Sequence, residues 1–438
     1  MGELSKDNLL RSWKEIAAYL GCDVRTCHRW EANHAMPVHR AEGGETKSPV
    51  FAYRDELDRW FKETFRDGNH PRGKVAKGNL WVKWAAGGAA VLVLAGAFLF
   101  IRAARTRRQP ADFAIDGSTL IVLDKQKREI WRKDTSVEGL QPEEFYRSNF
   151  QVIHRETSNM LPLLVMKDID GDRDTEVLFA LKRANDQTGE GVLICYDRLG
   201  NERWRFRAGR EIASQRKLFS PDYRIAGFFC HDFNGDGRLE TVVESFQAPD
   251  WPCQLAVLDA SGKMIGEFWN AGYLRDLIYH DIDADGREEL IVCGVNNEYR
   301  GGCLIVFDTR KIGGGSPQTG DYVVKGLAPG SMLYYVTVPY LDVSQAMGDR
   351  VDGLRTVDIT ENHWIRSMAS KGLIYEFAFN LKCVQVSWGN GYSVLHEDLV
   401  KAGKLTSVLD ETYRDTVLAG IRYWNGSTWT VEPSINRR

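Results

Sequence analysis

Three short stretches of the sequence alternate oxygen-bearing side chains with other residues. They are residues 168–176, 232–240 and 281–289, which we call the first, second and third loop. Positions 1, 3, 5 and 9 hold Asp168, Asp170, Asp172 and Glu176; Asp232, Asn234, Asp236 and Glu240; and Asp281, Asp283, Asp285 and Glu289. Oxygens at this spacing, with the carbonyl of position 7, can surround one hard cation that takes about six to eight oxygen ligands. The pattern therefore predicts Ca²⁺ sites.

Two features separate these loops from an EF-hand, which needs a Glu at position 12 and flanking helices. Position 12 is occupied by Phe179, Val243 and Val292, and an apolar, strand-like run follows each loop at once. The alternative is a metal-free turn, because Asp, Asn and Gly favour turns in any case. The first loop carries Arg173 where the others carry Gly237 and Gly286, so its turn is expected to be strained and its site weakened.

A second pattern recurs between the loops. An apolar strand ends on Asp at 120–124, 193–197, 255–259 and 304–308, and in the first three copies a polar turn and a second strand follow. Such hairpins are the units of propeller blades. Together with the loops they resemble the FG-GAP/VCBS-type repeats of integrin-like β-propellers. The resemblance implies calcium as cofactor and an all-β propeller of about six or seven blades over residues 109–438.

The first 66 residues carry signals for three helices and a hairpin. Ser12 and Glu15 form a capping box for a helix over Trp13–Leu20, which Gly21 ends. Asp23 caps a second helix that runs to about residue 31. Two short strands, 37–40 and 50–53, flank a Gly-Gly pair, and a third helix is expected from residue 54 to about 65.

This order resembles the winged helix-turn-helix of the MerR and excisionase group, on the strings SWKEIAAYLGCDVRTCHRWE, MPVHR and VFAYRDELDRWF. The resemblance implies that the second helix enters the major groove of DNA and that the wing contacts the backbone. The candidate DNA contacts are then Arg25, Thr26, His28 and Arg29 on the helix, with Arg40 and Lys47 on or near the wing. The alternative is a small module that contacts protein.

Residues 84–101 contain no charged side chain and are the most apolar run of the chain. A helix of that length spans roughly 27 Å, close to the ~30 Å hydrocarbon core of a bilayer, so the run predicts one transmembrane helix. The basic segment 67–83 is expected to be a juxtamembrane linker. The positive-inside rule favours a cytoplasmic N-terminus. A buried core helix and a signal peptide are the alternatives.

Composition narrows the remaining choices. The net charge of the 438 residues is −3, and residues 109–438 are acidic, with 48 Asp and Glu against 38 Lys and Arg. The eight cysteines are irregularly spaced, which leaves both disulfides and free thiols open. No phosphate-binding Gly-rich loop or nucleophile elbow occurs, and the aspartates are accounted for by the three loops. We therefore expect no enzyme; the alternative is a degenerate enzyme of the quinone-type dehydrogenases, which share Trp-bearing propeller repeats.

The sequence thus predicts a multidomain chain: a winged helix (1–66), a linker (67–83), a transmembrane helix (84–101) and a propeller (109–438). We expect a homodimeric regulator, single-pass in the inner (cytoplasmic) membrane. Its head would bind DNA and its propeller an unknown extracytoplasmic ligand or protein. The alternative is a membrane-anchored, calcium-dependent adhesion or scaffold protein whose head binds protein.

Overall fold

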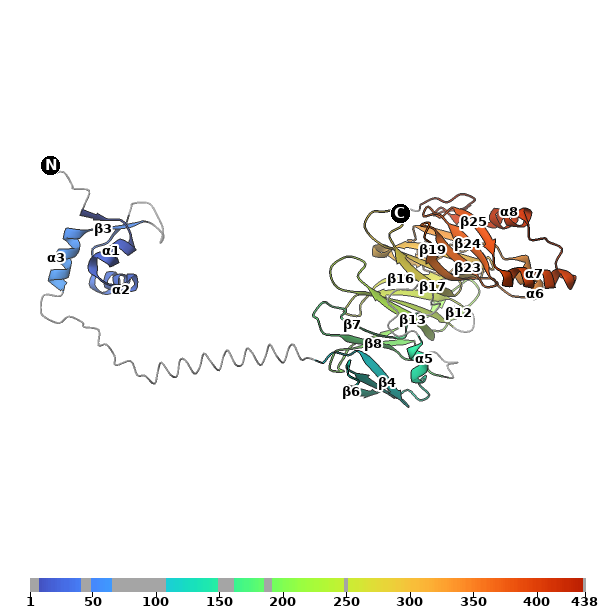
Figure 1. The fold of residues 1–438 in the computed structure, drawn as a ribbon, viewed down its shortest axis with the longest axis horizontal. Helices are drawn as coiled ribbons and strands as arrows, with labels where there is room; N and C mark the ends of the chain where they lie inside the picture. Colours follow the sequence, from blue (N-terminus) through green and yellow to red (C-terminus); the bar gives the residue numbers. More distant parts are fainter. Residues whose placement is uncertain are drawn as a thin grey trace. The chain divides into compact units, whose positions relative to one another are not determined.

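The computed structural model describes residues 8–40, 49–64, 108–148, 161–184, 191–247 and 251–435 (Figure 1). The chain divides into two compact units, Met1–Arg107 and Arg108–Arg438. We call the described part of the first unit (8–40 and 49–64) the head and the second unit the body.

The head is a small α+β unit in which three short strands pair antiparallel in the order β1-β3-β2. Its elements are β1 (Leu9–Leu10), α1 (Trp13–Leu20), α2 (Val24–His34), β2 (His39–Arg40), β3 (Val50–Tyr53) and α3 (Arg54–Thr64). The three predicted helices and the hairpin are present, and β1 adds a strand that the sequence analysis did not predict.

Local signals explain where the first two helices begin and end. The Ser12 hydroxyl accepts the backbone N–H of Glu15 at 3.3 Å, and the Glu15 carboxylate accepts the backbone N–H of Arg11 at 2.8 Å. Gly21 ends α1 in the left-handed region, at φ 66°. Asp23 caps α2 by accepting the backbone N–H of Thr26 at 2.8 Å. The core of the head is built on Ile16, Ala17, Cys27, Ala52 and Leu57, together with Leu10 and Met36.

The body is mostly β, and its strands form five successive sheets, which we call blades one to five. Blade one contains β4 (Asp112–Asp116), β5 (Thr119–Leu123) and β6 (Glu129–Asp134). Blade two contains β7 (Leu164–Lys167), β8 (Glu176–Ala180), β9 (Val192–Tyr196) and β10 (Glu202–Arg207). Blade three contains β13 (Tyr223–His231), β14 (Glu240–Gln247), β15 (Cys253–Leu258), β16 (Met264–Asn270) and the short strand β20 (Gly313–Gly315), which pairs with β16 in parallel.

Blade four is the widest, because the chain returns to it twice. It contains β17 (Leu274–His280), β18 (Glu289–Asn296), β19 (Gly301–Asp308), β21 (Tyr334–Thr337), β26 (Arg422–Trp424) and β27 (Trp429–Thr430). Blade five contains β22 (Leu354–Ile359), β23 (Ile365–Ala369), β24 (Leu373–Phe377) and β25 (Cys383–Trp388). A two-stranded hairpin, β11 (Ile212–Ala213) with β12 (Leu218–Phe219), stands between blades two and three in the chain.

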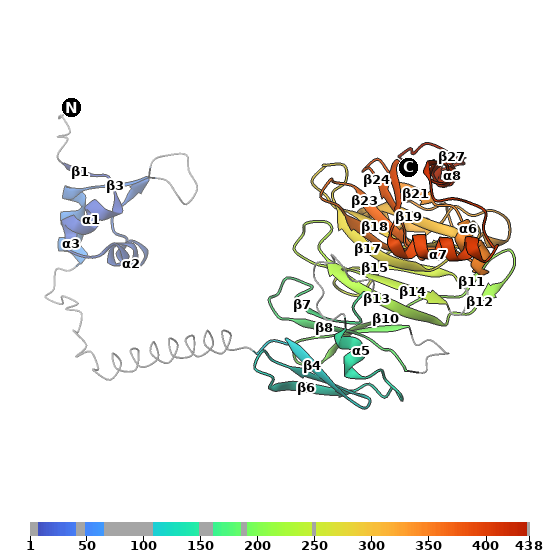
Figure 2. The ribbon, with the colours of Figure 1, turned by 45° about the vertical axis from the view of Figure 1, so that its right-hand side comes forward.

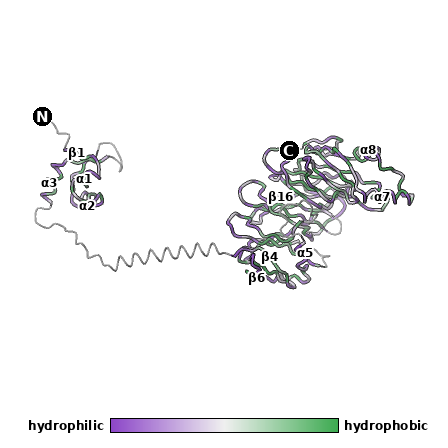
Figure 3. The backbone as a smooth tube through the Cα atoms, viewed as in Figure 1, coloured by the Kyte–Doolittle hydropathy of each residue, from purple (hydrophilic) through white to green (hydrophobic). Residues whose placement is uncertain are grey.

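Hydrophobic side chains fill the spaces between successive blades. Because side chains of a strand point alternately to its two faces, each inner strand serves two cores. Val243 of β14 belongs to the cluster shared with blades one and two, whereas Val242 packs into the cluster shared with blade four. Figure 3 shows hydrophobic segments running through these sheets. Figures 1 and 2 both place blade one and blade five at opposite ends of the body.

The described residues of the body form five blades where about six or seven were expected, because the last third of the body is used in another way. Among the described residues of the body, one α-helix, α5 (Glu143–Arg147), lies between blades one and two, and three lie in the last third: α6 (Asp342–Met347), α7 (Asn390–Lys401) and α8 (Glu411–Gly420). The last two bring Tyr392, Leu399, Tyr413 and Val417 into the cluster that covers blade five. The residues after α8 return to blade four as β26 and β27. All eight cysteines are free thiols.

The transmembrane part of the predicted fold class is not supported. Among the residues that the structure describes, no helix is long and apolar enough to cross a membrane. The longest of them, α7, has 12 residues and spans about 18 Å, well short of ~30 Å. The predicted span 84–101 and the linker 67–83 lie outside the described residues. The predicted fold class and the predicted membrane location are corrected accordingly: the described chain is an α+β head and a propeller-like, mostly β body.

In two blades, a tryptophan side chain packs against the hairpin turn of the following blade and donates a hydrogen bond to it. The Trp131 indole N–H donates to the carbonyl of Arg198 at 3.2 Å, and its ring covers Gly200. The Trp204 indole donates to the carbonyl of Ala260 at 3.1 Å, and its ring covers Gly262. Both glycines have positive φ, so the turn conformation and the ring contact each require a residue without a Cβ.

We expect Gly262→Ala to lower the free energy of unfolding of the body by roughly 2–4 kcal/mol. The added Cβ would lie 2.5 Å from the Trp204 ring, and the backbone would be strained at φ 81°. Gly117→Ala is the matched control, because Gly117 also has positive φ in a blade hairpin but nothing within 4 Å of its added Cβ. It should cost about 1 kcal/mol. Urea denaturation measures both, and equal losses would contradict the interlock.

Candidate metal centre and nucleic-acid interface

Each of the three predicted loops joins the first and second strands of a blade: β7 to β8, β13 to β14 and β17 to β18. The aspartate at position 1 organises the turn. Asp168 accepts the backbone N–H groups of Gly171 at 2.8 Å and Arg173 at 2.7 Å. Asp232 and Asp281 each accept the N–H of position 6 in the same way, at 2.9 Å. The shared geometry follows from the shared spacing.

The glutamate at position 9 closes each loop from inside. Its carboxylate accepts the backbone N–H of position 2, from Ile169 to Glu176 at 3.1 Å, from Phe233 to Glu240 at 3.0 Å and from Ile282 to Glu289 at 3.1 Å. These side chains are buried, with residue exposures of 1, 6 and 6%. Burial raises the pKa of Glu176 and of Glu289 to about 7, and neighbouring aspartates add to the effect. Burial also raises the pKa of Glu240.

Position 6 adopts the left-handed conformation in all three loops. Gly237 and Gly286 have φ values of 81° and 84°, and Arg173 is held at φ 71°. The third loop also places Ala284 at φ 59°. A left-handed residue other than glycine costs roughly 1–2 kcal/mol, so the first and third loops each retain a strained position.

The three loops touch in sequence along one side of the body. The N–H of Leu239 in the second loop donates to the carbonyl of Ile169 in the first, at 2.8 Å. His231, just before the second loop, lies 2.5 Å from the Glu288 carboxylate of the third and stacks on Tyr279 with ring centroids 3.8 Å apart. Oxygen-rich loops from three consecutive blades therefore form one continuous row.

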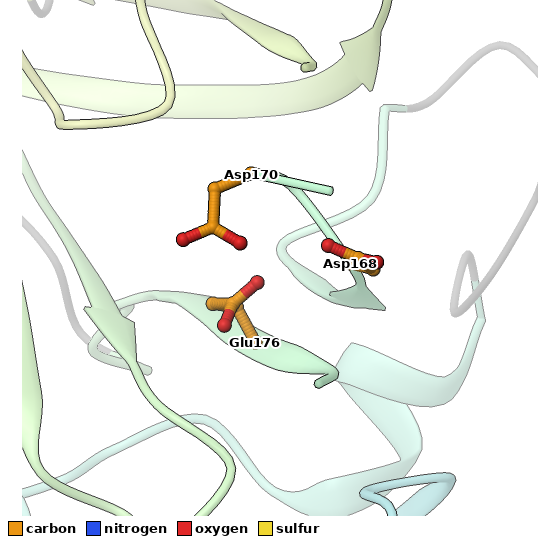
Figure 4. A group of neighbouring side chains, drawn as sticks. All are labelled: Asp168, Asp170 and Glu176. Carbon is orange, nitrogen blue, oxygen red and sulfur yellow. The ribbon is translucent and has the colours of Figure 1, made fainter. Parts of the chain in front are cut away.

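Within two loops the carboxylates approach closely enough to share an ion. The ligand oxygens of Asp168, Asp170 and Glu176 lie within 4.8 Å of one another, and Figure 4 shows Asp170 and Glu176 pointing toward each other. Those of Asp281, Asp283 and Asp285 are equally close.

In the second loop the amide of Asn234 donates to Glu240 at 3.0 Å. The position-5 aspartates of the first two loops lie at the loop surface, where Asp172 and Asp236 each accept one backbone N–H. Not every residue of the repeated pattern therefore takes part in the inner cluster.

Sequence reasoning missed one residue of the first loop. The Arg203 guanidinium contacts Asp170 at 2.6 Å and Glu176 at 3.1 Å. Among the described residues, no lysine or arginine forms an ion pair with the loop aspartates or Glu240 and Glu289 of the second and third loops. Aligning the hairpin repeats could have revealed the difference, because Arg203 occupies the place of Ile130 and Ile265. The clustered aspartate oxygens of the third loop are of the kind that a hard divalent cation prefers, whereas those of the first loop are already engaged by a cationic side chain.

The predicted DNA contacts of the head have different surroundings. Arg25 and Arg29 are exposed on the outer face of α2, and neither forms an ion pair within the described part of the chain. His28 is also exposed, but its ring lies 4.1 Å from that of Trp13. Thr26 donates its hydroxyl to Asp23 at 3.2 Å as part of the helix cap.

Arg40 and Lys47 are the two predicted DNA contacts on or near the wing. Arg40, at the end of β2, is held by Glu31 of α2 through an ion pair of 2.6 Å. This pair ties the strand to the helix and partly neutralises the arginine. Lys47 lies outside the described residues. Of the predicted DNA contacts, Arg25 and Arg29 are therefore the two arginines that are exposed and form no ion pair among the described residues.

No protein-family model and no curated protein matches this chain. Solved structures similar to it include the Dos1 propeller (10% identity, TM-score 0.34, 62% of this chain and 66% of that chain). Rhamnogalacturonan lyase YesW matches at 13% identity and TM-score 0.30, over 61% of this chain and 50% of that chain. The Bacillus licheniformis rhamnogalacturonan lyase PL11 matches at 14% identity and TM-score 0.28, over 73% of this chain and 65% of that chain. The chain thus spans less than two thirds of each of these proteins, and likenesses this distant carry no functional argument.

The hydrogen bonds of the second loop show which of its aspartates holds the backbone turn in place. Asp232 accepts the N–H groups of Gly235, Asp236 and Gly237, whereas Asp236 accepts only that of Arg238. In excess chelator, we expect Asp232→Ala to lower the free energy of unfolding by about 1–2 kcal/mol and Asp236→Ala by less than half as much. Chemical denaturation of both variants measures the difference. Equal losses would show that Asp232 does not hold the turn.

Proposed function

We propose that this chain is a DNA-binding regulator whose body binds divalent cations and serves as its sensing or interaction module. The head supplies DNA contact through α2, and the second and third loops each hold one hard cation, for which Ca²⁺ is the best match. A homodimer would present two heads to two half-sites, as helix-turn-helix proteins commonly do.

The observation that carries the DNA proposal is the division of α2 into two faces. Cys27 is fully buried, and Val24 and Trp30 pack against the same core. Arg25 and Arg29, four residues apart, share the opposite face and are exposed. A helix fixed by its inner face, with two guanidinium groups outside, can present them to base edges or phosphates, which arginine binds bidentately.

The cation proposal rests on the chemistry of the donors in the second and third loops. In the third loop the oxygens of Asp281, Asp283 and Asp285 lie within 4.8 Å of one another. The second loop carries two aspartates and an asparagine at the same positions, and each of the two loops has a buried glutamate at its base. Among the described residues, no lysine or arginine lies within ion-pair distance of these carboxylates. Gathering like charges raises the free energy of the folded state, and a bound divalent ion would offset that cost. Bound Ca²⁺ would supply charge neutralisation and crosslink the two strand ends, which suits an interaction surface.

Arg25→Ala and Arg29→Ala should each weaken specific DNA binding by about 1–3 kcal/mol, roughly 5- to 150-fold in Kd. The operator would first be selected from random duplexes with the full-length chain, and affinities would then be measured at several salt concentrations. Arg59→Ala is the matched control, since it removes one exposed charge from α3. It should change affinity only slightly.

Two results would count against DNA reading by α2. Equal losses for Arg25→Ala and Arg59→Ala would point to diffuse charge attraction rather than contact by one helix face. If no duplex were enriched and Arg25→Ala bound bulk DNA as well as the unmodified chain, the head would be a protein-contact module. The chain would then be better described as a scaffold.

Cation binding should stabilise the body. At a hundredfold excess of free Ca²⁺ over Kd, linkage contributes about 2.7 kcal/mol per site, so melting in chelator should occur at a lower temperature than melting in Ca²⁺. The double variant Asp232→Asn/Asp281→Asn should lose most of this response, because it removes the position-1 carboxylate from both loops. Identical melting temperatures for the unmodified chain with calcium and with chelator would refute the cation sites.

A further inference from the structure

A β-bulge recurs at the same place in the first three blades. In β10 the residues on either side of Arg203 pair with successive residues of β9, so Arg203 itself has no partner across the ladder. Ile130 of β6 and Ile265 of β16 occupy the same bulge in blades one and three. A bulge changes the direction of the extra residue's side chain. In each of these blades, one side chain at the bulge therefore points away from the regular alternation of its strand.

In blade two the redirected side chain reaches the first loop. Arg203 Nη2 lies 2.6 Å from Asp170 Oδ2, and Nη1 lies 3.1 Å from Glu176 Oε1. The guanidinium thus bridges positions 3 and 9, two of the oxygens that a metal would need. Its side chain is 31% exposed, whereas that of Glu176 is 2% exposed, so the pair is protected from water mainly on the carboxylate side.

In blade three the corresponding bulge carries an apolar residue. Ile265, Asn234 and Glu240 line one cavity of about 230 Å³ together with Arg310, whose guanidinium pairs with Asp308 at 2.7 Å. The bulge residue beside the second loop is therefore uncharged, and the arginine that lines its cavity is held by an aspartate outside the loop. The same nine-residue pattern is combined with two different surroundings.

We propose that Arg203 is the resident cation of the first loop and excludes a divalent ion from it. The guanidinium donates a charge-assisted hydrogen bond, which is the strong type, to Asp170 and forms an ion pair with Glu176. A divalent ion could enter only after both contacts break, because it would otherwise lie against a like charge. The chain would then bind two divalent cations, although its sequence repeats the loop three times. The total of two rests on the proposed binding by the second and third loops.

Matched aspartates at position 3 test the inference without altering Arg203. Bound ⁴⁵Ca²⁺ would be counted by equilibrium dialysis of the full-length chain at saturating calcium. The unmodified chain should bind two ions. Asp283→Asn should reduce the number to one, and Asp170→Asn should leave it at two. Three ions on the unmodified chain, falling to two in Asp170→Asn, would overturn the proposal.

Removing the guanidinium tests the exclusion directly. Arg203→Met should raise the number of bound ions to three, and the added Asp170→Asn change should return it to two. Arg198→Met is the control, because Arg198 pairs at 3.2 Å with the side chain of Asp174 at position 7 of the same loop, where the backbone carbonyl and not the carboxylate is the expected ligand. It should leave the number at two. An unchanged number in a folded Arg203→Met chain would also overturn the proposal, and the aspartate comparison decides if that variant does not fold.

The count also separates this inference from the cation proposal itself. If the unmodified chain bound no calcium and Arg203→Met bound one ion, cation binding by the second and third loops would be refuted. Exclusion by Arg203 would stand, because loss of the guanidinium alone would have created a site.

Discussion

A buried glutamate begins the second strand of three consecutive blades, and the architecture of the loop row depends on it. Glu176, Glu240 and Glu289 each accept a backbone N–H from position 2 of their own loop, which holds the turn against the strand. A buried carboxylate beside two or three aspartates is costly unless a positive charge is near. Each loop must therefore be protonated, paired or loaded with a cation. Burial raises the pKa of both Glu176 and Glu289, and in the first loop the neighbouring Arg203 opposes that rise.

The charge of each loop also affects its neighbours, because the three loops contact one another. The first loop accepts a hydrogen bond from the second, and His231 joins the second to the third through Glu288. Tryptophan contacts at Gly200 and Gly262 also join blade one to blade two and blade two to blade three. Hydrogen bonds and packed rings therefore connect each loop to the next, so the three loops share neighbours within the body.

Local signals predicted local structure well. The capping box at Ser12 and the cap at Asp23 fixed the starts of α1 and α2, and the recurring Asp turns marked the blade hairpins. Long-range features could not be predicted in the same way. The return of β26 and β27 to blade four, which left five blades, depends on packing among residues more than eighty positions apart in sequence. The pairing of Arg40 with Glu31 likewise depends on how β2 crosses α2, which no short motif encodes.

The first loop shows why a motif alone does not define a site. Its oxygens are set by nine contiguous residues, but its surroundings are set by Arg203, which is 33 positions from Asp170 in sequence. The bulge that delivers this side chain is common to three blades, so the backbone is the same whether the delivered residue is arginine or isoleucine. The identity of one residue thus decides whether the negative charge is balanced from within the chain or from solution. Repeats with the same loop can therefore differ in function while keeping the same fold.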